Sequence, residues 1–276
     1  MKYMLCSILA FLFSTAHADT FKIGSRNLVY IPAPDGFSLV TSDMEMVNRM
    51  FKHLVVPGNE PLAYYIPNSQ IASAKSGSMP TFTRYFMVTV DDSFKKPTIG
   101  VKDFAKVKEV YKIELNNIIK EVKEKVPAFY KKASEDISVE FGQNFEVNMI
   151  KMFPLELHRE NINSLSYSMY MNLGGVDEPG YIGAVYTFTI LNVSGKVVFL
   201  YCYGLKNDIE WTRSASKAWE DAILSGNNPA PQLSMNFDET KDSTDTMKQF
   251  WKDPVFRTLI IVFIFGLIRS AFKSSE

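Results

Sequence analysis

Residues 164–173 alternate between apolar and mostly small polar side chains, and this alternation constrains the fold more than any other part of the sequence. The apolar positions are Leu165, Tyr167, Met169 and Met171, and the polar positions are Ser164, Ser166 and Ser168. Successive side chains of a strand point to opposite faces of its sheet. We therefore expect a strand with one buried and one wet face, which is typical of an antiparallel sheet.

Further strands are expected on both sides of this segment. They cover residues 27–31, 62–66, 84–90, 137–141, 145–157, 182–191 and 196–203. The last two are joined by Asn192-Val193-Ser194-Gly195, which predicts a tight hairpin. The near-continuous apolar run 197–203 predicts a central strand covered on both faces.

The longest helix is expected over residues 101–126, where apolar side chains recur at helical spacing. Pro127 ends this pattern, because the residue before a proline disfavours α geometry. A shorter helix is expected over residues 43–54, capped by Ser42, and residues 68–80 are expected to form a loop.

A last helix is expected between Asn207 or Asp208, as its cap, and Gly226, as its stop. One stripe of this helix should pack on the sheet, and it consists of Trp211, Ala215, Ala218, Trp219 and Ala222. Strands and helices without regular βαβ alternation predict an α+β fold, a mostly antiparallel sheet flanked by helices.

The two ends of the chain carry separate apolar segments. Residues 1–18 combine Lys2, a short apolar run and the triplet Ala16-His17-Ala18, which predicts a secretory signal peptide. Residues 250–272 include an apolar stretch that is long enough, as a helix, for a thin bilayer. We expect a single C-terminal membrane-spanning helix there, with a buried terminal helix as the alternative.

These segments predict five parts: signal peptide 1–18, periplasmic α+β domain 19–226, flexible polar linker 227–249, transmembrane helix 250–272 and cytoplasmic tail 273–276. The expected location is the inner membrane of a bacterial cell, crossed once, with the main domain in the periplasm. The membrane itself is then one partner, bound through the C-terminal helix.

Charge and composition exclude nucleic-acid-binding and disordered proteins. Basic and acidic residues number 30 each, so the chain has no basic surplus with which to bind nucleic acid. A hydrophobic content of 46% excludes a disordered chain. The lysines between Lys102 and Lys132 are interleaved with acids, which indicates a solvated helix face; attraction to anionic lipid headgroups is the alternative.

The sequence assigns no catalytic, cofactor-binding or metal-binding residue, and no cofactor is expected. Cys202, the one cysteine outside the signal peptide, lies in an apolar run and is predicted to be a buried, inert thiol. His53 and His158 stand on different elements and lack the spacing of a zinc motif.

Two weaker motifs leave alternatives open. Met44, Met46, Met50 and His53 could offer thioethers and an imidazole to Cu(I), although methionines at this spacing are also ordinary core residues. Asn192 heads a glycosylation acceptor triplet, which has no meaning in a bacterial host.

Residues 29–37, residues 195–200 and the helix with Trp211 and Trp219 carry a resemblance. The chain resembles uncharacterised exported bacterial proteins whose domain is an α/β/α sandwich of the PsbP and DcrB type. The resemblance covers about residues 27–226. It implies a six- or seven-stranded antiparallel sheet with flanking helices and a non-catalytic binding or assembly role. It assigns no functional residue, and the long helix from Val101 departs from the minimal fold.

The expected function is that of a membrane-tethered, non-enzymatic periplasmic domain that binds a protein partner or supports an envelope complex. The alternative is an envelope enzyme or a small-ligand or copper-binding protein, whose pocket is assembled from residues distant in sequence. A shallow surface with exposed aromatic residues would favour the first; a deep cleft with clustered carboxylates or both histidines would favour the second.

Overall fold

The computed structural model describes residues 19–24, 27–53, 55, 58–78, 83–142, 148–174 and 182–234 of the 276-residue chain. The predicted signal peptide, membrane-spanning helix and cytoplasmic tail lie outside these residues, as does the predicted linker after Ser234. Among the helices of the described residues, none is both long and apolar enough to cross a membrane.

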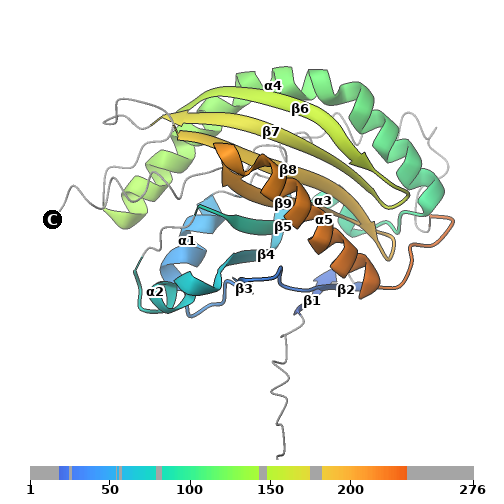
Figure 1. Cartoon of the computed structure of the whole chain (residues 1–276), viewed down its shortest axis with the longest axis horizontal. Helices are drawn as coiled ribbons and strands as arrows, with labels where there is room; N and C mark the ends of the chain where they lie inside the picture. The colour runs from blue at the N-terminus through green and yellow to red at the C-terminus, as the bar shows by residue number, and fades with distance from the viewer. Residues whose placement is uncertain are drawn as a thin grey trace, which may run out of the picture.

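Seven strands form one sheet in which all neighbours are antiparallel, in the order β3-β4-β5-β9-β8-β7-β6 (Figure 1). The strands are β3 (Phe37–Leu39), β4 (Asn59–Pro67), β5 (Tyr85–Asp91), β6 (Asn148–Glu160), β7 (Ser164–Gly174), β8 (Ile182–Val193) and β9 (Lys196–Leu205). A separate antiparallel pair consists of β1 (Asp19–Ile23) and β2 (Asn27–Ile31).

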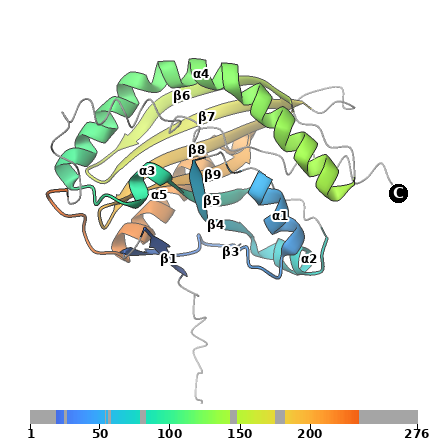
Figure 2. The same cartoon turned by 180° about the vertical axis from the view of Figure 1, so that it is seen from behind.

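Helices flank both faces of this sheet. They are α1 (Glu45–His53), α2 (Ile71–Lys75), α3 (Asp92–Lys95), α4 (Val101–Phe141) and α5 (Ile209–Ser225). In Figure 1, α5 lies in front of the sheet, whereas Figure 2 shows α1 and α3 on the opposite face and α4 arching along the β6 side. The predicted α+β fold is confirmed, but α2 lies inside segment 68–80, which was expected to be a loop.

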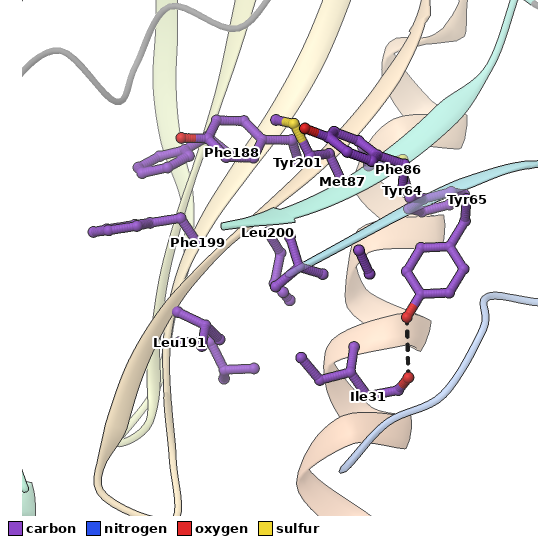
Figure 3. Close-up of a cluster of buried hydrophobic side chains, with 14 of the residues drawn as sticks. Ile31, Tyr64, Tyr65, Phe86, Met87, Phe188, Leu191, Phe199, Leu200 and Tyr201 are labelled. Atoms are coloured by element: carbon purple, nitrogen blue, oxygen red, sulfur yellow. Dashed lines mark hydrogen bonds between the residues drawn. The ribbon is translucent and has the colours of Figure 1, made fainter. Parts of the chain in front are cut away.

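The centre of the core is aromatic. Strand β9 is buried on both faces, as its apolar run predicts. The ring of Phe199 on this strand lies 5.7 Å from that of Phe188 and 6.5 Å from that of Tyr111 on α4, between ring centroids. Figure 3 shows part of this cluster together with Tyr65, whose hydroxyl donates to the carbonyl of Ile31 at 3.0 Å and thereby ties β2 to the sheet.

The hairpin between β8 and β9 is as tight as predicted. Its two loop residues, Ser194 and Gly195, both have positive φ, at 53° and 84°. This geometry matches the twist of the flanking strands and joins them without further residues.

The predictions that Pro127 ends the long helix and that residues 137–141 form a strand are wrong. Helix α4 passes through both positions and spans 41 residues in all. Proline removes one helix hydrogen bond and disfavours α geometry at its predecessor, at a cost of about 3 kcal/mol. Tertiary contacts beyond the proline offset this cost. Glu140 pairs with Arg49 and His53 of α1, and the last turns of α4 bury apolar side chains in the core.

The expectation of a wet face on β7 is also wrong. Ser164, Ser166 and Ser168 are buried. Their hydroxyls bond to side chains of β8 and α5, so the helix covers this face. An alternating pattern therefore separated the two faces correctly, but it could not show that the polar face is covered.

Helix α5 turns mainly polar residues to the sheet. Its buried residues are Thr212, Ser216, Trp219, Glu220 and Ile223. Of the stripe expected to pack on the sheet, only Trp219 is buried; Trp211 and the three alanines are half-buried or exposed. These four residues border a hollow beside the helix.

The chain after α5 stays attached to the domain up to Ser234, although the linker was predicted to begin at residue 227. The Pro231 carbonyl accepts from the Val101 amide at 2.8 Å, and the Ser234 hydroxyl accepts from the Gly100 amide at 2.8 Å. A Cβ on Gly100 would lie 2.4 Å from the Leu233 backbone, so only glycine permits this approach.

Candidate functional site

A hollow of about 230 Å³ opens between α5 and the turn that connects β2 to β3. Its lining comes from three segments distant in sequence, and consists of Ala33, Pro34, Asp35, Phe37, Phe86, Trp211, Ala215, Ala218, Trp219 and Ala222. All but one of these residues are apolar. The hollow is therefore built to exclude water from an apolar group rather than to bind a highly charged one.

The turn Pro34–Phe37 forms one wall. The Phe37 amide donates to the Pro34 carbonyl at 3.0 Å, and Gly36 adopts a φ of 80°, which the Asp-Gly pair at this turn predicts. The Gly36 carbonyl accepts from the Asn68 amide at 2.9 Å, which anchors the turn to the end of β4. The turn thus holds Phe37 in the wall, while Asp35 beside it is exposed.

Four aromatic rings form the rest of the wall and the floor. Phe86 of β5 stands at their centre, with centroid distances of 4.8 Å to Phe37, 5.7 Å to Trp211 and 5.0 Å to Trp219. All three pairs meet edge to face, the geometry that ring quadrupoles favour, worth about 0.5–1.5 kcal/mol each beyond burial. The indole Nε1 of Trp219 also donates to the Pro32 carbonyl at 2.7 Å. These contacts preorganise the hollow.

Trp211 is held from outside by a charged pair. Arg84 lies over its ring at 4.3 Å and donates from Nη2 and Nε to Asp208, at 2.6 and 3.2 Å. The hydrogen bond from Arg84 lowers the pKa of Asp208, and the Leu205 amide also donates to this carboxylate at 3.0 Å. The pair fixes the rotamer of Trp211, and Asp208 neutralises the Arg84 charge.

Small residues form the rim on α5. Ala218 and Ala222 are exposed, and Ala215 is half-buried. Because alanine has no side chain beyond Cβ, the backbone of another molecule can approach this rim closely. The hollow is thus open toward solvent along the helix.

On its other side, α5 contacts β7 and β8 through hydroxyl groups. The Thr189 hydroxyl lies 2.8 Å from that of Ser166 and 3.0 Å from that of Ser216, which joins all three elements. A parallel chain runs from Ser168 through Thr187 to Thr212, with oxygen separations of 3.1 Å at both steps.

Glu220 of α5 is fully buried at the end of this polar contact between the helix and the sheet. Its Oε1 accepts from Ser164 at 2.7 Å, from Asn161 at 2.8 Å and from Arg159 at 3.0 Å. Among the described residues, its Oε2 has no hydrogen-bond partner. A carboxylate so held secures α5 to the sheet and does not face the hollow, since Glu220 is absent from the lining.

Ser168 and His158 form the pair closest to a nucleophile and a base, with 3.4 Å between the hydroxyl and Nδ1. Burial, and next the charges of Arg213 and Arg159, lower the pKa of His158 to about 4, so the imidazole is neutral at pH 7. Ser168 is 0% exposed, however, and its hydroxyl also accepts from Arg213 at 3.2 Å. A substrate cannot reach this hydroxyl, so the contact is structural.

The other sequence candidates are engaged in structural contacts. His53 bonds to Glu140, and Met44 and Met50 are core residues, so three of the four candidate copper ligands are engaged in other contacts. Cys202 is buried as predicted, and burial raises the pKa of its thiol. Within the described part of the chain, no group of three or more His, Cys, Asp or Glu side chains could hold a metal ion.

Asn192, the candidate glycosylation site, is 1% exposed, and its Nδ2 donates to the Ile99 carbonyl at 3.0 Å. Attachment of a glycan would require this bond to break and the hairpin to open. The asparagine is therefore part of the core.

The aromatic hollow was not found by sequence reasoning. Residues 29–37 and the helix with Trp211 and Trp219 were noted, but not as neighbours in space. Phe86 and the Arg84–Asp208 pair carried no local signal, since partners 124 positions apart in the chain form no motif. The chain matches no protein-family model, and its comparison with curated proteins found no match either.

Proposed function

We propose that this chain is an exported, membrane-tethered and non-enzymatic domain that binds a protein partner through the aromatic hollow beside α5. The observation that carries the proposal is the hollow itself: preorganised aromatic rings, partly open to solvent, with a rim of alanines. Aromatic anchors in a pocket with a small rim are typical of the energetic centre of protein interfaces.

The size and chemistry of the hollow support a protein partner over a substrate. Small-molecule sites commonly enclose roughly 300–1,000 Å³ and contain several convergent polar groups. This hollow encloses about 230 Å³, and Asp35 is the one titratable group in its lining. A single large side chain of a partner fills such a space, whereas acid–base chemistry needs a second group near the first.

The tether is the other half of the proposal. A signal peptide at 1–18 and a membrane-spanning helix at 250–272 would hold the domain in the periplasm, at the inner membrane of a bacterial cell. A partner in the same membrane then meets the hollow at high effective concentration, so weak contacts suffice. The likeness to PsbP- and DcrB-type sandwiches agrees with this binding or assembly role and remains part of the proposal.

Site-specific crosslinking in cells tests the proposal. A photo-reactive amino acid replaces Ala218, exposed at the rim, in the full-length chain; the matched control carries it at Lys217, exposed on the same helix but outside the lining. We expect a defined crosslinked protein, identified by mass spectrometry, from position 218 and not from position 217. Equal products from both positions, or none from 218, would overturn the proposal.

A charge variant provides a second test. Ala218→Glu places a carboxylate at the rim, and Ser214→Glu places the same charge one turn earlier, outside the lining. We expect only Ala218→Glu to abolish co-purification of the crosslinked partner. Equal recovery with both variants would show that the hollow is not the contact.

A further inference from the structure

Asp35 is the only charged residue in the lining of the hollow. It is exposed, and among the residues that the structure describes it has neither an ion-pair nor a hydrogen-bond partner. The turn that holds it is anchored on one side by the Trp219–Pro32 hydrogen bond and on the other by the Asn68–Gly36 hydrogen bond, which keeps the carboxylate near the rim. A negative charge beside an apolar hollow favours partners that carry a positive charge next to an apolar group.

The neighbouring charges are already paired. Arg84 is neutralised by Asp208, and on the exposed face of α5 Lys217 pairs with Asp221 at 2.6 Å. Arg213 and Glu210 form a longer pair on the same helix, at 3.6 Å. The uncompensated charge at the hollow is therefore the single negative charge of Asp35.

The walls favour an aromatic guest. Phe37, Trp211 and Trp219 each meet Phe86 at a steep angle, and a further ring can add to such a cluster edge to face. The alanines on the rim let the backbone beside the guest lie against α5. One aromatic side chain fits within the 230 Å³ space.

We infer that the hollow recognises an aromatic side chain that is followed by a lysine or arginine in an exposed segment of the partner. The ring enters the hollow beside α5, and the cation pairs with Asp35 at its rim. This inference rests on the proposed function, since it names the chemistry of the partner at the same site. A partner segment with an acidic residue in place of the lysine or arginine would be repelled by the Asp35 carboxylate.

Defined peptides test the recognition of both groups. Three acetylated, amidated hexapeptides differ only at two central positions, which are Phe-Lys, Phe-Glu or Ala-Lys between Gly-Ser flanks. Binding to the purified full-length chain in lipid nanodiscs is measured by calorimetry and by the fluorescence of its tryptophans. We expect the Phe-Lys peptide to bind at least threefold more tightly than either of the others, as an exposed charge pair and a buried ring allow.

Variants of Asp35 locate the charge. Asp35→Asn should weaken Phe-Lys binding about threefold to fivefold and remove the preference for Lys over Glu, and Asp35→Lys should reverse that preference. Glu135→Gln, which removes an exposed carboxylate on α4, should leave all three affinities unchanged. Equal binding of the three peptides, no binding of Phe-Lys, or an unchanged preference in Asp35→Asn would overturn the inference.

The two proposals fail separately. If position 218 crosslinks to a partner but Asp35→Asn leaves the peptide preference unchanged, the docking function stands and the aromatic–basic motif is wrong. If position 218 yields no crosslink, the proposed function fails first, and the motif fails with it.

Discussion

The two sides of α5 contact the rest of the protein through different kinds of interaction. Toward β3 and β5 the helix packs by aromatic rings, with Trp219 and Trp211 against Phe86. Toward β7 and β8 it is held by hydroxyl chains and by the buried Glu220. Hydrogen bonds are directional and define the position of the helix, whereas the aromatic side leaves an open space beside the rings. The hydroxyl side thus fixes α5, and the aromatic side offers the hollow.

The largest effect is expected from the charged end of the hydroxyl side. Glu220→Ala removes the carboxylate that faces Arg159 and leaves two further polar groups, of Ser164 and Asn161, without their acceptor. We expect a loss of about 3–5 kcal/mol in the free energy of unfolding, because Arg159 loses its buried partner and keeps only the half-exposed Asp221, while the two polar groups lose their acceptor. Denaturant unfolding of the full-length chain in detergent measures it. Glu220→Gln, which retains an acceptor, should lose less; an equal loss would show that charge is unimportant here.

The next effect is expected on the aromatic side. Trp219→Phe keeps a ring but removes the indole donor to the Pro32 carbonyl, and should cost about 1–2 kcal/mol of unfolding free energy. The same measurement on Trp211→Phe gives the comparison for a half-buried ring. A larger loss for Trp211 than for Trp219 would contradict the role assigned to the Pro32 contact.

A single link of the hydroxyl chains should matter less. Thr189→Val preserves shape but leaves the Ser166 and Ser216 hydroxyls without their shared partner, a loss of about 1 kcal/mol. Thr189→Ser retains the hydroxyl and serves as the control. If valine proves as stable as threonine, these hydroxyls do not contribute to the docking of α5.

A pH dependence from His158 should be of similar size to the Thr189 effect. Its pKa is about 4 in the folded chain and near 6.5 when unfolded, so between these values the unfolded chain binds the proton more strongly. The free energy of unfolding should therefore fall as the pH drops from 7 toward 4, by about 1 kcal/mol once solvent screening of this half-exposed group is considered. Unfolding at pH 7 and 5 should show a smaller difference for His158→Asn than for the natural chain; equal differences would assign the effect to other groups.

The strands of the sheet could be predicted where the sequence pattern involves near neighbours in the chain. Strands β7, β8 and β9 and the hairpin at Ser194 and Gly195 follow from alternation, apolar runs and turn residues. The continuation of α4 beyond Pro127 was not, because Glu140 meets Arg49 and His53 only after the chain has folded back. Local preference yields where distant contacts are stronger than the cost of one proline.

The same limit applies to the candidate site. The sequence shows the Asp35-Gly36 pair of a turn and the tryptophan stripe of α5. That both lie around Phe86 depends on the strand order of the sheet, which residue spacing does not predict. The stripe was assigned to the sheet because apolar residues usually face a core. Here the Ser, Thr and Glu residues of α5 face the sheet, since β7 and β8 present matching hydroxyls.

Periodicity, turn residues and apolar runs by themselves determined the fold class and most strands, because these signals arise between near neighbours in the chain. Two features emerged only when α5 met the sheet: the burial of the serine face and the aromatic hollow with Asp35 at its rim. Both join side chains from elements far apart in sequence, and the free energy of such contacts exists only once the backbone has brought them together.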